Sequence, residues 1–325
     1  MPWISPKYEF DVLMIGNTGV GKTSLLASMA DQLQKSDNQH IEIFYPEYRT
    51  SFWLGEALTQ LKYMCQTDGI IPGLGVEGTI EPRQFVFDIR QKDQEKAAFS
   101  IRIHDYPGSA FNPSSEHNES VNSLIERAFL ILVFIDMPAL MENGGKFNNI
   151  RNNPGAFNQI LCQQMEAHKK ALPILLTGLR GEKYIRFGDY NPAVNKIYDL
   201  YENVIKTAQK FDTQYDNVFT CFPQTIGSII FDEFEERVTD QGKIVPVYKF
   251  KKVSQYISYS PKDCDLPLKF LITRALAASV VQRRQYHEGF NWLRDFFGRD
   301  IETYKALELV SQEIKNTNLF TFKRF

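Results

Sequence analysis

Residues 16–23 are Gly-Asn-Thr-Gly-Val-Gly-Lys-Thr, a full match to the pattern G-x-x-x-x-G-K-[ST]. The mostly apolar residues 10–15 come directly before this segment and predict a buried strand. Residues 22–34 follow it, with leucine and methionine side chains at helical spacing, and predict a helix. A glycine-rich turn between a strand and a helix is the arrangement that holds phosphate groups, so this segment predicts a nucleotide site.

Each position of this phosphate loop has a physical role. The glycines let successive backbone N–H groups point inward, and the helix that begins near Lys22 adds the positive end of its dipole. Lys22 supplies a positive charge for the β- and γ-phosphates, Thr23 is a candidate Mg²⁺ ligand, and Ser24 is placed to reach the α-phosphate. The other expected nucleotide contacts are Gly16, Asn17, Thr18, Gly19, Val20 and Gly21.

Buried strands alternate with helices as far as residue 222. Strands are predicted at 41–45, 129–135, 173–177 and 218–222, and helices at 52–65, 118–127, 156–171 and 192–210. Glycine- or asparagine-rich loops are predicted at 69–78 and 142–155. This alternation indicates an α/β fold of the P-loop NTPase type, with a mostly parallel sheet and helices on both faces.

One antiparallel hairpin is expected within this sheet. Apolar and polar residues alternate through 85–90 and again through 99–104, on either side of a short polar turn. The second strand leads without a gap into Asp105-Tyr106-Pro107-Gly108, which has the form D-x-x-G.

A phosphate loop followed by a hairpin that ends in D-x-x-G resembles the Ras-like P-loop GTPases of the TRAFAC class. The D-Y-P-G form and the long insertion before the hairpin most resemble the bacterial double-GTPase branch, found in conflict and signalling systems. The resemblance covers roughly residues 8–225. It implies that the chain binds GTP and GDP with Mg²⁺. It also implies that Asp105 binds Mg²⁺ through water and that the Gly108 N–H contacts the γ-phosphate.

The same resemblance implies a threonine that binds Mg²⁺ and the γ-phosphate from a switch loop. Thr79 is the best candidate, because it follows the glycine-rich loop and lies just ahead of the hairpin. Thr50 and Thr67 are the alternatives. A γ-phosphate that holds both Thr79 and Gly108 would order two loops, and hydrolysis would release them.

The chain departs from this family in the segment that reads the base. Ras-like GTPases carry N-K-x-D after a strand, and its aspartate accepts two hydrogen bonds from guanine. Here the predicted strand ends in Thr177-Gly178-Leu179-Arg180, so that an arginine, which offers only donors, stands in place of the aspartate. Glu182 or Asp189 could replace it from a shifted loop. Otherwise base selectivity is relaxed or the base differs, and ATP is not excluded.

The second departure concerns hydrolysis. The residue after D-x-x-G is often a glutamine that orients the attacking water, but here it is Ser109, followed by Ala110 and Phe111. Slow intrinsic hydrolysis is therefore expected. Arginines that could act on the phosphates from within the chain are Arg49, Arg83 and Arg151, and no sequence argument selects among them.

We divide the chain into a Ras-like domain (1–228), an insertion near the base pocket (229–262) and a closing helix with a C-terminal helical tail (263–325). The insertion is expected to contain a hairpin near residues 241–242, and helices are expected at 266–287 and 300–315. Residues 221–227 occupy the position at which such proteins contact the base. Aromatic residues after 288 are expected to pack on the domain itself or to bind a partner.

Charge and cysteine content argue against several classes of function. The formal net charge of −2 gives no electrostatic case for nonspecific nucleic-acid binding, and four widely spaced cysteines suggest neither a zinc site nor a redox dithiol. We expect a soluble, cytoplasmic protein without a transmembrane segment.

The leading hypothesis is a GTP-dependent molecular switch with slow, Mg²⁺-dependent hydrolysis that acts through a protein effector or regulator. The alternatives are an ATPase, a small-molecule kinase or a pseudo-GTPase scaffold.

Overall fold

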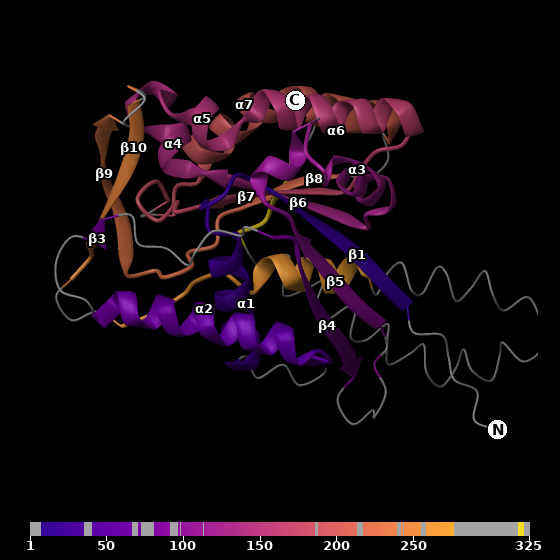
Figure 1. The fold of residues 1–325 in the computed structure, drawn as a ribbon, viewed down its shortest axis with the longest axis horizontal. Coiled ribbons are helices and arrows are strands. Elements are labelled where there is room, and N and C mark those ends of the chain that lie inside the picture. Colours follow the sequence, from indigo (N-terminus) through magenta and orange to yellow (C-terminus); the bar gives the residue numbers. More distant parts are fainter. Residues whose placement is uncertain are drawn as a thin grey trace, which may run out of the picture.

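The computed structural model describes most of the chain. The described residues are 8–35, 41–66, 71–72, 81–91, 97, 99–112, 114–185, 188–212, 217–238, 242, 244–254, 258–275 and 318–321. Within them, an eight-stranded sheet has the strand order β11-β8-β7-β6-β1-β5-β4-β2 (Figure 1). Its strands are β1 (Tyr8–Ile15), β2 (Ile41–Phe44), β4 (Arg83–Gln91), β5 (Phe99–Asp105), β6 (Leu130–Asp136), β7 (Ile174–Leu179), β8 (Val218–Cys221) and β11 (Phe320–Thr321).

The centre of the sheet is parallel and its edges are antiparallel. Strand β1 pairs in parallel with β5 and β6, and β6, β7 and β8 continue the parallel arrangement. Strands β4 and β5 form the predicted antiparallel hairpin, with Arg83 opposite Asp105 and Ile89 opposite Phe99. The mostly parallel sheet with this hairpin confirms the predicted fold class.

Helices cover both faces of the sheet, as Figure 1 shows. One face carries α1 (Lys22–Lys35), α2 (Tyr48–Gln66) and a helix whose described part is 266–275. The other face carries α3 (Asn118–Arg127), α4 (Met137–Met141), α5 (Asn148–Asn152), α6 (Pro154–His168) and α7 (Asn191–Phe211). Each helical layer packs an apolar stripe against the sheet, which is the usual solution for a sheet that is apolar on both faces.

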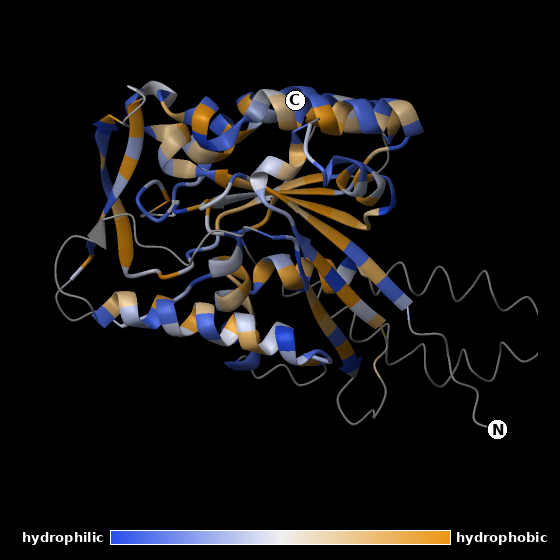
Figure 2. Cartoon of the chain, viewed as in Figure 1, coloured by the Kyte–Doolittle hydropathy of each residue, from blue (hydrophilic) through white to orange (hydrophobic). Residues whose placement is uncertain are grey.

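Two apolar clusters form the core, one on each side of the sheet. Every residue of β6 is buried, and Val12 and Leu13 of β1 point into opposite clusters. In Figure 2 the strands at the centre are therefore largely hydrophobic, whereas the helices show polar residues outward. Among the described helices, none combines the length and the apolar character needed to cross a membrane.

The insertion forms a second, smaller sheet. Strands β9 (Ile229–Val238) and β10 (Ile244–Lys252) make the predicted hairpin, with Gly242 at a φ of 72° in its turn. Strand β3 (Ile71–Pro72) pairs with β10, so that the sheet has the order β3-β10-β9. The pairing joins the glycine-rich segment before the β4–β5 hairpin to the insertion, which the sequence did not predict.

Other differences from the sequence predictions are local. The expected loop at 142–155 contains the 3₁₀ turn η2 (Glu142–Gly145), helix α5 and the beginning of α6. Strand β7 runs to Leu179 rather than ending at residue 177. Strand β11 pairs antiparallel with β8, and its Phe320 packs on the rings of Tyr190 and Phe222, as expected for a tail that packs on its own domain. The helix predicted at 300–315 and the second half of the helix predicted at 266–287 lie outside the described residues.

Candidate functional site

The phosphate loop joins β1 to α1 and has the backbone shape that its glycines allow. Gly19 and Gly21 have φ angles of 78° and 111°, a region that side chains with a Cβ rarely adopt. The Val20 N–H donates to the carbonyl oxygen of Asn17 at 3.3 Å, which closes the turn. The loop thus presents a series of backbone N–H groups next to the N-terminus of α1, as anion binding requires.

Lys22 and Asp105 meet at this loop, although they come from α1 and from the end of β5. The Lys22 ammonium donates to the carbonyl oxygen of Gly16 at 2.9 Å and lies 3.6 Å from the nearer Asp105 carboxylate oxygen. Both side chains are buried, with exposed fractions of 4% and 0%. Burial lowers the pKa of Lys22, and the neighbouring carboxylate partly offsets this effect. Thr23 and Ser24, the next residues of α1, are buried beside the loop.

Gly108 lies directly against the phosphate loop. A β-carbon on this residue would be 2.9 Å from the Cα of Asn17 and 3.0 Å from the backbone nitrogen of Thr18. The structure therefore brings the D-x-x-G segment to the loop. The next residues form the 3₁₀ turn η1 (Gly108–Phe111), in which Ala110 and Phe111 are buried and Ser109 is exposed.

The guanidinium group of Arg180 is held next to the phosphate loop rather than turned outward. One of its nitrogens donates to a carboxylate oxygen of Asp136 at 2.7 Å, and the other donates to the carbonyl oxygen of Gly19. Arg180 itself has a left-handed backbone with a φ of 58°. Asp136 ends β6, so Arg180 links the loop to the neighbouring strand of the sheet.

Asp136 and Tyr248 belong to the same cluster, and sequence reasoning missed both. Asp136 is 2% exposed and accepts hydrogen bonds from the Ala139 N–H at 3.1 Å and from the Tyr248 hydroxyl at 2.7 Å. The Tyr248 ring lies 4.6 Å from the Arg180 guanidinium. An aspartate that follows an apolar strand and precedes Met-Pro was a visible helix-capping pattern, but nothing in the sequence pointed to Tyr248.

A pocket opens beside the phosphate loop. Its lining comes from the loop and α1 (Val20, Gly21, Ser24), α2 (Leu61, Met64), the segment after β7 (Leu179, Arg180, Glu182), and the insertion with the residues before it (Thr225, Ile226, Ile229, Phe250). Thr177 is not part of this lining. It is fully buried within β7, where its hydroxyl donates to the carbonyl oxygen of Leu175 at 3.5 Å and accepts a weak hydrogen bond from the Cys221 thiol.

Glu182 is the acidic residue of this pocket. Its side chain is buried, and burial raises its pKa to about 7, against the opposing effects of its own backbone N–H and of the Arg180 charge. Asp189, the other acidic candidate, is exposed and accepts a hydrogen bond from the Asn191 N–H at the beginning of α7.

The remaining candidates divide into those that the structure describes and those that it does not. Thr79 and Thr67 lie outside the described residues. Thr50 is fully buried in α2, and its hydroxyl accepts a hydrogen bond from the Val86 N–H at 3.1 Å, which gives it a structural role.

The three candidate arginines lie in different surroundings. Arg49 is exposed, and Arg83 lies over the Trp53 ring. Arg151 donates to the carbonyl oxygen of Pro246 at 2.8 Å, and its own carbonyl accepts a hydrogen bond from the Asn17 side chain of the phosphate loop at 3.0 Å. Only Arg151 among these three is thus connected to the phosphate loop by a described hydrogen bond.

Comparisons with known proteins add distant similarities. No model of a known protein family matches the chain, and no curated protein matches its sequence. Among solved structures, it is similar to Sup35 complexed with GDP, at 10% identity over 68% of this chain and 38% of that chain, with a TM-score of 0.31. It is also similar to the S. cerevisiae Ski7 GTPase-like domain bound to GTP, at 12% identity over 66% of this chain and 43% of that chain, with a TM-score of 0.33.

A third similar structure is the conserved domain of the dynein light intermediate chain, at 10% identity over 94% of this chain and 98% of that chain, with a TM-score of 0.33. This chain covers less than half of the length of the Sup35 and Ski7 chains. At such low identity and TM-score these similarities say nothing about what the chain binds. The fold class rests on the order of its strands, and the site rests on the contacts described above.

Proposed function

We propose that the chain binds a nucleoside triphosphate with Mg²⁺ at residues 16–23 and hydrolyses it slowly, with GTP as the preferred nucleotide. The observation that carries this proposal is the meeting of Lys22, Asp105 and Gly108 at one loop. These residues come from separate segments, and each has the chemistry that one part of a bound triphosphate requires. A structural turn without a ligand would have no need of a buried lysine that points into it.

The residues at the loop also fit a magnesium ion. Asp105 is a fully buried carboxylate beside Lys22, and the Thr23 hydroxyl is on the first turn of α1, so oxygen ligands of the type that Mg²⁺ prefers are present. We propose that Thr23 and Asp105 hold the ion, together with Thr79 from the switch loop. When bound, the ion neutralises the charge that develops on the phosphate oxygens. Lys22 orients the β- and γ-phosphates, and the Gly108 N–H holds the γ-phosphate.

Glu182 is proposed to select the base. Strand β7 extends to Leu179, two residues beyond its predicted end. The K-x-D part of N-K-x-D is therefore matched by Arg180-Gly181-Glu182, which has a basic residue, any residue and an acidic residue in that order. Both residues line the pocket, but the Arg180 guanidinium is bonded to Asp136 and Gly19, so Glu182 is the acidic group of the lining. An ionised carboxylate accepts hydrogen bonds from the adjacent N1–H and N2–H₂ donors of guanine, whereas adenine presents an acceptor at N1.

The proposed chemistry is slow because none of the three residues that directly follow D-x-x-G has a side chain suited to orient water. Ala110 and Phe111 are apolar and buried, and the Ser109 side chain is exposed. A slow reaction suits a switch, whose GTP-bound form must persist long enough to act on a protein partner. Hydrolysis would break the contacts of Gly108 and Thr79 with the γ-phosphate, and the partner would detect this change.

An ATP-dependent enzyme is the second candidate function, and one observation favours it. The pKa of Glu182 is about 7, so a substantial fraction of this side chain carries a proton near neutral pH. A protonated carboxyl group offers one donor and one acceptor, which matches the N1 acceptor and the N6–H₂ donor of adenine.

The deciding experiment measures the affinities for GTP and ATP in the presence of Mg²⁺, together with phosphate release. We expect GTP to bind at least tenfold more tightly, and Lys22→Ala to abolish the binding of either nucleotide. Lys210→Ala is the matched control, because Lys210 pairs with Glu166 on the surface and should leave binding unchanged. A preference for ATP would contradict the guanine assignment, and undiminished binding by Lys22→Ala would contradict the phosphate site.

A further inference from the structure

The β9–β10 hairpin is attached to the domain at its foot. Gln224 and Lys262 exchange backbone hydrogen bonds at 2.8 Å and 2.9 Å, and the Ser260 N–H donates to the carbonyl oxygen of Ile226 at 3.1 Å. Gly227 lies between these bonds with a φ of 73°. The two ends of the insertion are thereby tied together, and the hairpin extends from them as one unit (Figure 1).

One strand of this hairpin contacts the phosphate loop through a short chain of bonds. The Tyr248 hydroxyl donates to Asp136 at 2.7 Å, and the same carboxylate oxygen accepts from Arg180, whose second nitrogen donates to Gly19. The hydroxyl is a dependable donor, because burial raises the pKa of Tyr248. The Tyr248 ring also lies close to two guanidinium groups, 4.6 Å from that of Arg180 and 4.8 Å from that of Arg151.

The same strand provides a wall of the pocket. Phe250 is two residues after Tyr248 and therefore on the same face of β10, and its ring lies parallel to that of Tyr248 at 6.0 Å. Phe250 lines the pocket together with Val20 and Ser24. An aromatic ring at this position is suited to pack against a planar base.

Strand β10 also pairs with the segment before the proposed switch threonine. Lys249 is opposite Pro72 and Phe250 is opposite Ile71 in the antiparallel pair with β3. Thr79 follows this pair by seven residues in the chain. A change in the position of β10 would therefore move both the wall of the pocket and β3.

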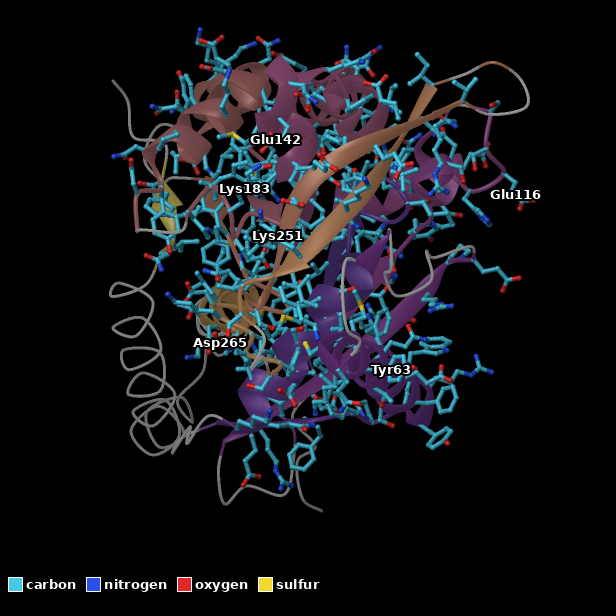
Figure 3. All side chains as sticks on the ribbon, turned by 90° about the vertical axis from the view of Figure 1, so that its left-hand side faces the viewer. Tyr63, Glu116, Glu142, Lys183, Lys251 and Asp265 are labelled. Atoms are coloured by element: carbon cyan, nitrogen blue, oxygen red, sulfur yellow. The ribbon has the colours of Figure 1, made fainter. Side chains whose placement is uncertain are left out.

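The other attachments of the hairpin are weaker or lie nearer its tip. Phe234 packs on the Phe147 ring at 4.9 Å, Lys146 pairs with Glu236, and Lys183 contacts the carbonyl oxygen of Asp232 at 3.4 Å. Figure 3 looks onto this side of the molecule and shows the hairpin, with Lys251 on it, running past Lys183 and Glu142. Ion pairs between exposed side chains contribute little, so two polar contacts mainly hold the hairpin: the buried bond from Tyr248 to Asp136, and the bond from Arg151 to the carbonyl oxygen of Pro246 at 2.8 Å.

We propose that the β9–β10 hairpin is a gate that controls nucleotide release. In this gate Phe250 forms a wall of the base pocket, and the hydrogen bond from Tyr248 to Asp136 is the latch that holds the hairpin closed. The proposal rests on the proposed function, because it takes the pocket to be the nucleotide site. It assigns to the insertion a regulatory role: a partner that draws the hairpin away from Asp136 would accelerate exchange. Nucleotide bound against Phe250 would in turn hold the hairpin closed.

The test is the dissociation rate of a fluorescent guanosine diphosphate from the intact chain with Mg²⁺. Tyr248→Phe keeps the ring and removes the latch, and it should raise the dissociation rate about tenfold, as expected for loss of a hydrogen bond to a charged group. Phe250→Ala should raise it by at least as much. Tyr63→Phe, an exposed tyrosine on α2, is the matched control and should leave the rate unchanged.

Amide hydrogen exchange provides the second measurement. Nucleotide should slow exchange in residues 229–238 and 244–252, and Tyr248→Phe should remove part of that protection while α3 and α6 remain protected. Unchanged dissociation rates and exchange in both variants, with nucleotide bound normally to the unmodified chain, would overturn the gate and leave the proposed function intact. A failure of the unmodified chain to bind any nucleotide would instead overturn the proposed function, and the gate with it.

Discussion

Gly108 is pressed against Asn17, so that a β-carbon on the glycine would lie 2.9 Å from the Cα of the asparagine. Real β-carbons are not found so close to a backbone atom, and both partners here are backbone rather than flexible side chains. The D-x-x-G segment and the phosphate loop can therefore approach each other in this way only because residue 108 has no side chain. The proposed contact of the Gly108 N–H with a γ-phosphate depends on this close approach.

The first prediction follows from this contact. Gly108→Ala should displace either η1 or the phosphate loop, lower the free energy of unfolding by about 1–3 kcal/mol, and weaken triphosphate binding more than diphosphate binding. Denaturant unfolding and titration with GTP and GDP measure both effects. Gly55→Ala is the control: a β-carbon on this exposed glycine of α2 meets nothing within 4 Å, so the change should leave stability equal or slightly higher. Equal effects of the two substitutions would contradict the close contact.

The second prediction concerns Arg180. Arg180→Ala would leave the buried Asp136 carboxylate without its charged partner, although the donors from Ala139 and Tyr248 remain. We expect a loss of about 2 kcal/mol in the free energy of unfolding, and weaker nucleotide binding because Gly19 loses its contact. Lys206→Ala, which removes an exposed ion pair with Glu202, should change stability by less than about 1 kcal/mol. A similarly small effect at Arg180 would show that Asp136 does not depend on it.

The third prediction is a pH dependence due to Glu182. Its pKa is about 7 in the folded chain and near its ordinary value of 4.5 in the unfolded chain. Between these values the folded chain holds a proton that the unfolded chain has released, so the free energy of unfolding decreases as the pH rises through this window, by roughly 3 kcal/mol. Glu182→Gln should remove this decrease. Unfolding of the nucleotide-free chain at pH 5 and pH 8 measures it.

Glu202→Gln serves as the control for that experiment, because Glu202 is a surface residue and its substitution should preserve the pH profile. The same Glu182→Gln variant should also lose most of its preference for GTP over ATP, since an amide cannot accept from both guanine donors. If Glu182→Gln kept both the full pH dependence and the full preference for GTP, Glu182 would have neither of these roles.

The fourth prediction separates backbone strain from steric conflict in the insertion. Gly227 and Gly242 both have left-handed φ angles, 73° and 72°, but a β-carbon on Gly227 would lie 1.9 Å from the carbonyl oxygen of Ser260, whereas one on Gly242 would meet nothing within 4 Å. Gly242→Ala should lower the free energy of unfolding by about 1–2 kcal/mol. Gly227→Ala should lower it further and separate the two ends of the insertion, which thermal unfolding and hydrogen exchange at residues 224–228 would detect.

Local patterns in the sequence were sufficient to predict the phosphate loop, the β4–β5 hairpin and the alternation of strands with helices. Residues 16–23 and the apolar runs around them act over short distances, because the backbone shape of a glycine turn and the burial of an apolar strand depend on neighbouring residues. The D-x-x-G segment was equally visible, because it follows its strand directly. Thr79 stays a prediction, since it lies outside the described residues.

Other features depended on residues far apart in the chain. The pairing of β3 with β10 and of β11 with β8 each involves a strand of two residues, β3 or β11, which is too short to carry a pattern that predicts it. The extension of β7 to Leu179 arises from its pairing with β6, where Leu179 is opposite Asp136. That extension places Glu182, as well as Arg180, in the lining of the pocket.

The sequence by itself determined that this chain has a phosphate loop and the sheet that carries it. Only the tertiary structure decided what surrounds that loop. Tyr248 and Asp136 are 112 residues apart, yet a single hydrogen bond of 2.7 Å joins them beside Arg180. Such a contact depends on how separately formed elements pack, and no local propensity encodes it, because its energy arises only when both partners are buried at the same place.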